Sequence, residues 1–82
     1  MNDYTLEQLA AKGVVEAQYE LGNRLTHQSG SNNVIRGINY LHIAAKNGSS
    51  KARIVLDKAI TSLRQRAEKG DSIAYHILMS IK

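Results

Sequence analysis

One pattern of four residues recurs three times in this chain, and it limits the possible folds more than any other feature. The segments AAKGVVEAQYEL, AKNGSSKARIVL and AEKGDSIAYHIL each contain Ala-x-x-Gly-x-x-x-Ala-x-x-x-Leu. Internal repetition at this scale indicates that similar helical units are stacked along the chain. The repeated positions are Ala10, Gly13, Ala17 and Leu21, then Ala45, Gly48, Ala52 and Leu56, then Ala67, Gly70, Ala74 and Leu78.

The repeated glycines predict helix ends. Glycine destabilises a helix interior by up to about 1 kcal/mol relative to alanine, but it readily adopts the left-handed conformation that ends a helix. A lysine lies just before each glycine, where positive charge suits a helix C-terminus. We therefore expect one helix to end and the next to begin at each glycine, with Ser49, Ser50 and Asp71 as candidate caps.

The whole pattern predicts an all-α fold with about five helices. Proline and strand-like runs are missing from the sequence, which favours uninterrupted helices. Val14, Ala17, Leu21 and Leu25 are expected to form the buried stripe of the second helix. The first expected helix is a short one from Leu6, capped by Thr5 with Gln8, and the second follows Gly13 and runs to about Gln28. The others are one over 34–47 after a turn at 29–33, one over 50–69, and a terminal capping helix within 70–82.

The chain resembles the Sel-1-like repeats, relatives of the tetratricopeptide repeats, over residues 9–82. The motifs AQYELG, RGINYL and AAKNG match the two helices of a complete unit at 9–48, and KAITSL and RAEKG match a truncated unit at 48–70. The resemblance implies one helical-repeat domain over 1–82, built as a short right-handed α/α superhelix. It also implies protein–protein recognition through the concave side of that superhelix.

The second unit is shorter than the first. Sixteen positions separate Leu21 from Gly37, whereas three separate the matching Leu56 and Ala59. We therefore expect the two helices of this unit to be fused into one. Because a fused helix cannot fold back as a hairpin, the terminal helix must cap the stack from another direction. With a single complete hairpin in the monomer, homodimerisation is a reasonable hypothesis.

The polar residues show no arrangement typical of a catalytic centre or metal site. His27, His42 and His76 are expected on three different helices, with no partner at helical spacing for zinc. Each glycine is expected to be isolated at a helix end, so no phosphate-binding loop is predicted. We therefore expect a non-enzymatic protein with no catalytic residue, metal or cofactor.

With no signal peptide and no membrane-spanning run in the sequence, the protein is expected to be cytoplasmic and without membrane contact.

A binding surface remains as the expected functional element. The formal net charge of +4 suits an acidic partner, but it is also an ordinary solubility charge. On the fused helix, basic residues at 51, 58, 66 and 69 share one side, which is either a solvated face or a surface for an acidic partner. If the resemblance holds, the partner-binding residues are Glu16, Glu20, Asn23, Arg24, His27, Arg53 and Arg64.

Three functions remain open from the sequence. The first is a protein-interaction module that binds a partner protein as an adaptor or a small inhibitor, for example of the immunity or phage anti-defence type. The second is a weak nucleic-acid binder that uses the basic side of the fused helix, which is disfavoured because aromatic residues for stacking are few. The third is a fragment of a longer repeat protein. Steep salt dependence of DNA binding would favour the second function.

Overall fold

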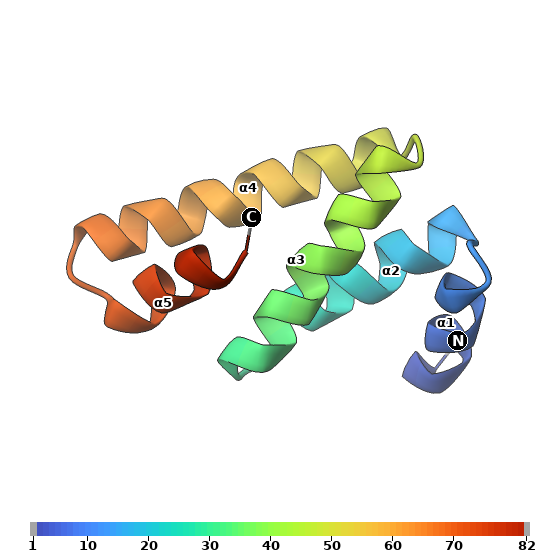
Figure 1. The fold of residues 1–82 in the computed structure, drawn as a ribbon, viewed down its shortest axis with the longest axis horizontal. Coiled ribbons are helices and arrows are strands. Elements are labelled where there is room, and N and C mark those ends of the chain that lie inside the picture. Colours follow the sequence, from blue (N-terminus) through green and yellow to red (C-terminus); the bar gives the residue numbers. More distant parts are fainter. Residues whose placement is uncertain (1, 82) are drawn as a thin grey trace.

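The chain forms an array of helices in which the longest helix runs along the long axis of the molecule (Figure 1). A computed structural model describes residues 2–81, and within them lie five helices and no strand. The helices are α1 (Asp3–Ala11), α2 (Val15–Thr26), α3 (Ser31–Lys46), α4 (Ser50–Glu68) and α5 (Ser72–Ser80). The all-helical prediction is confirmed, and so is the single long helix expected over 50–69. The terminal helix lies within the expected range 70–82, whose last residue is outside the described part.

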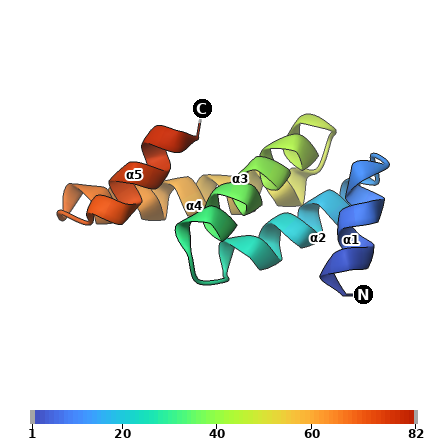
Figure 2. The same cartoon turned by 60° about the horizontal axis from the view of Figure 1, so that its bottom comes forward.

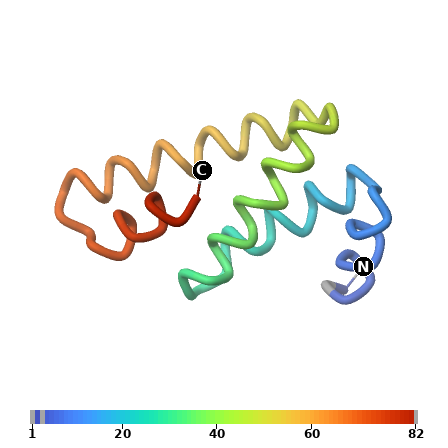
Figure 3. Tube along the Cα trace, in the orientation of Figure 1, coloured from blue at the N-terminus to red at the C-terminus, as the bar shows by residue number. Residues whose placement is uncertain are grey.

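Each helix packs mainly against its neighbours in sequence, so the molecule is elongated, with extents of 38 × 23 × 17 Å. Helix α3 lies between α2 and α4, while α1 covers one end of α2 (Figures 1 and 2). The trace in Figure 3 runs from α1 at one end of the long axis to the α4–α5 turn at the other. Helix α5 then returns along the second half of α4, so both helices contribute to one end of the molecule.

The same hydrogen-bonded corner ends α1, α3 and α4. Gly13, Gly48 and Gly70 have φ angles of +91°, +103° and +99°, which glycine adopts without strain. At each corner the glycine N–H donates to the carbonyl three residues earlier, and the next N–H donates to the carbonyl five residues earlier. These two bonds satisfy carbonyls that the helix itself leaves unpaired. The predicted helix-ending role of the three glycines is therefore confirmed.

The starts of α4 and α5 agree with the sequence, whereas the start of α1 differs. The Ser49 hydroxyl accepts a hydrogen bond at the start of α4, and the Asp71 carboxylate accepts two at the start of α5, as expected of caps. Helix α1 instead begins before Thr5, because the Asn2 side chain accepts from the Thr5 N–H at 2.8 Å. The predicted capping box of Thr5 with Gln8 is therefore wrong.

Helix α3 begins at Ser31, inside the segment 29–33 that was expected to be a turn. The chain reverses at Gly30, where φ is +101°. The Gly30 carbonyl already accepts from the Val34 N–H, and the Asn33 side chain donates back to the Ser29 carbonyl at 2.9 Å. The turn prediction is wrong for residues 31–33 because polar residues in a loop and in a first helical turn look alike in composition.

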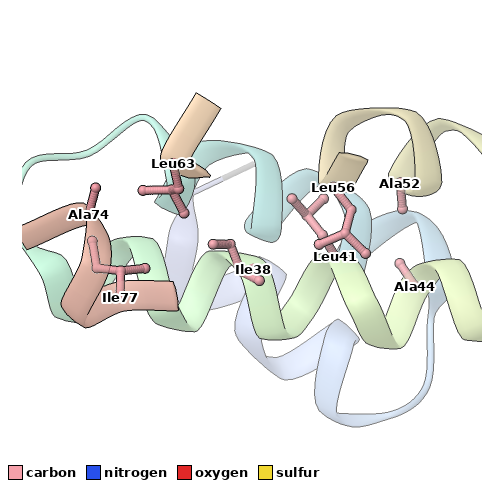
Figure 4. Close-up of a cluster of buried hydrophobic side chains, with 8 residues drawn as sticks. All are labelled: Ile38, Leu41, Ala44, Ala52, Leu56, Leu63, Ala74 and Ile77. Carbon is pink, nitrogen blue, oxygen red and sulfur yellow. The ribbon is translucent and has the colours of Figure 1, made fainter. Parts of the chain in front are cut away.

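The core consists of two clusters of buried apolar side chains. The first joins α1 to α2 and contains Leu6, Ala10, Ala17, Leu21 and Leu25. The second joins α3, α4 and α5 and contains the side chains shown in Figure 4: Ile38, Leu41, Ala44, Ala52, Leu56, Leu63, Ala74 and Ile77. Val14 precedes α2 and is 41% exposed, so its predicted place in the buried stripe is wrong.

Two glycines lie inside helices and bring α2 and α3 into backbone contact. Gly22 and Gly37 are both buried, and a Cβ atom added to either would lie within 3.0 Å of the other's carbonyl oxygen. The two helices can therefore approach this closely only where both residues lack a side chain. The expectation that every glycine is isolated at a helix end is wrong at these two positions.

Candidate functional site: a groove beside helix α4

A groove of about 960 Å³ opens on the side of α4 that faces α2 and α5. The end of α2 and the following turn contribute Asn23 and residues 26–30, α3 contributes Ser31 and Val34, and α5 contributes Ile73 and Ile77. Helix α4 contributes Val55, Lys58, Ala59, Ser62, Leu63 and Arg66. These residues are far apart in the sequence, and they meet because α3 holds α2 beside α4 while α5 folds back along α4 (Figure 1).

The groove has an apolar floor. Leu63 and Ile77 belong to the core and are 3% and 2% exposed, so they form a fixed base. Val34 and Val55 are partly buried beside them, and Ile73 is 60% exposed at one edge. Apolar surface of this kind can be removed from water only by a ligand that fills the groove.

The charged residues that line the groove are cations. Arg66 Nε donates a hydrogen bond to Asp71 Oδ2 at 3.1 Å, and Arg66 Nη2 lies 3.0 Å from the same oxygen in an ion pair. A hydrogen bond from the Ala74 N–H and the Arg66 guanidinium hold the pKa of Asp71 below its ordinary value, which keeps this carboxylate ionised. The side chain of Lys58 is exposed, and among residues 2–81 it has no carboxylate partner and no side-chain hydrogen bond. Among the described residues that line the groove, Lys58 is therefore the cation without a carboxylate partner.

His27 follows α2 directly and also lines the groove. Its Nδ1 atom is 2.7 Å from the carbonyl oxygen of Asn23. Because a carbonyl can only accept, Nδ1 carries the hydrogen, and in the neutral ring Nε2 is then an acceptor. The Asn23 carbonyl thus fixes both the tautomer and the direction of the ring in the lining of the groove.

Two of the sequence-predicted partner residues, Asn23 and His27, line this groove. Arg64 instead lines a smaller pocket of about 210 Å³, which also involves residues of α3 and α5. The other predicted partner residues line neither space: Glu16, Glu20, Arg24 and Arg53.

The structure joins two features that the sequence presented separately. Asn23 and His27 come from the helix expected to supply the concave face, while Lys58 and Arg66 come from the basic side of the fused helix. All four line the same groove. The sequence alone does not predict that these four residues line one groove, because a residue's position around α4 does not reveal which neighbouring helix it faces.

The remaining polar groups are scattered over the molecule. Among residues 2–81, no three His, Cys, Asp or Glu side chains are grouped closely enough to hold a metal ion. His27 follows α2, His42 lies on α3 and His76 on α5. None of the helices described in the structure has the length and apolar character needed to cross a membrane.

Comparison of the chain with protein-family models, with curated proteins and with solved structures found no match. The function is therefore inferred from the groove itself and from the motifs of the sequence.

Proposed function

We propose that this chain is a small, non-enzymatic protein-interaction module that binds a partner protein in the groove beside α4. The observation that carries this proposal is the lining of the groove. It combines a buried apolar floor of Leu63 and Ile77 with a polar rim of His27, Lys58 and Ser62. An apolar centre within a polar rim is the usual anatomy of a protein interface.

We further infer that the helices form a short right-handed superhelix of the Sel-1-like type. The three equivalent glycine corners support this inference, since they place the same turn after α1, α3 and α4. The recurring alanines Ala17, Ala52 and Ala74 support it too, because all three are buried between helices. Under this proposal the protein acts in the cytoplasm as an adaptor or an inhibitor.

Homodimerisation remains a separate prediction. Tyr75 and Met79 lie one helical turn apart on α5 and are 59% and 63% exposed. This apolar surface lies outside the groove lining, so self-association through it would leave the groove available to a partner.

A tryptophan in the groove tests the proposed function. Ligands are first selected from a random-sequence peptide library displayed on phage, with the full chain as the target. Ser62 is exposed and lines the groove, so Ser62→Trp fills the groove without entering the core. We expect this variant to weaken the Kd of the selected peptides by at least about tenfold, since an interface is sensitive to blocked contacts at its centre.

The matched control is Thr61→Trp, which adds the same side chain at the neighbouring position. Thr61 is exposed on α4 and does not line the groove. Its variant should bind within about twofold of the wild type, as expected for a position outside an interface. A selection that yields no ligand, or ligands that bind the Ser62→Trp variant as well as the wild type, contradicts the proposed function.

A further inference from the structure

We propose that the occupant of the groove is an acidic amphipathic segment of a partner protein, which places apolar side chains on the floor and a carboxylate beside Lys58. This inference rests on the proposed function and adds the chemistry of the partner. It is carried by the charges that line the groove and by the apolar floor between them.

The charge of the groove has one sign. Lys58 and Arg66 line it, and no Asp or Glu among the described residues does. Arg66 is already neutralised by Asp71, so the hydrogen bond and the ion pair between them hold the edge at α5 in place. Lys58 has no such carboxylate among the described residues, and it also lines the groove. A carboxylate from a partner would complete this pair and would be favoured over a cation there.

The start of α3 adds to the positive potential. Gly30 and Ser31 line the groove, and α3 has neither a side-chain cap nor an acidic residue in its first turn. The first N–H groups of a helix carry partial positive charge, which falls off within about one turn. Acidic side chains of a bound segment are therefore favoured beside Lys58 and beside the start of α3.

The apolar floor requires more than charge from the partner. Val34, Val55 and Ile73 contribute partly or largely exposed apolar surface beside the buried Leu63 and Ile77. A purely acidic segment would leave this surface in contact with water, whereas an amphipathic one would cover it. The segment therefore needs apolar residues that reach the floor and carboxylates that reach the rim.

Nucleic acid fits the groove less well. No aromatic residue among those described lines it, so it has no stacking platform for bases. Only Lys58 is an uncompensated cation in the lining, whereas binding to a phosphate backbone uses several such contacts. The acidic polypeptide is the better match, and nucleic acid becomes one outcome of the test.

The test uses the composition of the peptides selected from the random library. We expect them to be enriched in Asp and Glu relative to the unselected library. Lys58→Glu replaces attraction by repulsion at an exposed position, and it should weaken their Kd by at least about tenfold. Lys58→Gln removes only the attraction and should give an intermediate Kd. Circular dichroism of each variant checks that the helices are retained.

The matched control is Arg53→Glu, which changes the net charge by the same amount on the same helix. Arg53 is exposed and lines neither pocket, so its variant should bind within about twofold of the wild type. If Ser62→Trp abolishes binding while Lys58→Glu does not, the proposed function stands and the acidic partner is rejected. Selected peptides without acidic enrichment reject it as well. The acidic partner is also rejected if a DNA or RNA duplex displaces these peptides and if binding of the duplex requires Lys58.

Discussion

Replacing Gly37 by alanine is expected to lower the free energy of unfolding by about 3 kcal/mol, the upper part of the range for overpacked positions. A Cβ atom at this position would lie 2.7 Å from the backbone nitrogen of Thr26 and 2.8 Å from the carbonyl oxygen of Gly22. Both are backbone atoms of α2, so no side-chain rotation relieves the contact. Helices α2 and α3 must move apart, which weakens the packing on both sides of the contact.

The sign of this effect is what makes the Gly37→Ala measurement informative. In an ordinary helix interior, alanine stabilises relative to glycine by about 0.5–1 kcal/mol. The control is Gly48→Ala, where an added Cβ meets no atom within 4 Å and only the positive φ opposes the change. That variant should lose about 1–2 kcal/mol. Urea denaturation followed by circular dichroism compares the three proteins, and a Gly37→Ala variant as stable as the wild type contradicts the close approach of α2 and α3.

Truncating Leu41 to alanine is expected to cost about 3–5 kcal/mol, as for other fully buried leucines. Leu41 is 0% exposed on α3, and its Cγ atom lies 2.8 Å from where a Cβ of Gly22 would be. It therefore fills the space directly beside the glycine contact and also belongs to the cluster with Leu56. A domain of this length has a total stability of about 4–12 kcal/mol, so this loss is a large share of it and the urea midpoint should fall in proportion.

The matched control for Leu41→Ala is Ile43→Ala on the same helix. Ile43 is 43% exposed, so the same kind of truncation removes little buried surface. Its cost should stay below about 1 kcal/mol, in line with exposed apolar positions. The same urea titration serves both variants, and equal losses for Leu41 and Ile43 would show that the core does not lie where the structure places it.

The sequence predicts those parts of the fold that depend on residues close together in the chain. The corners at Gly13, Gly48 and Gly70 follow from a local rule, because a left-handed residue after a helix is most often glycine. The fused helix α4 follows from the three-residue spacing between Leu56 and Ala59, which leaves no room for a turn. Both predictions need no knowledge of distant contacts.

Contacts between distant residues could not be predicted in this way. Gly22 and Gly37 look like any other glycine until the two helices are placed against each other. Gln18 is polar but buried, since it donates to the Ala10 carbonyl and accepts from Asn47, which lies 29 positions further along. The amphipathic pattern of α2 gives no sign of this bond, because the pattern describes one helix at a time.

The groove belongs to the same class of features. Asn23 and His27 are predicted partner residues, and Lys58 lies on the predicted basic side of α4, but their meeting depends on how α3 orients α2 relative to α4. Arg53 and Arg64 lie on the same helix as Lys58, at positions that do not line the groove. Helical spacing shows that these residues lie on different sides of α4. Which of the sides lines the groove depends on how α2 and α5 pack around α4.

The most direct test of the proposed binding face is an NMR titration of the ¹⁵N-labelled chain with the tightest peptide from the selection. The account predicts that the largest amide shifts fall on the groove, at the turn after α2, around Lys58 and Ser62, and at the start of α5. The amides of Thr61 and Arg53, on the other sides of α4, should shift less than these. Shifts concentrated at Arg64 and His42, which line the smaller pocket, or on α1, would contradict the claim that this groove is the binding site.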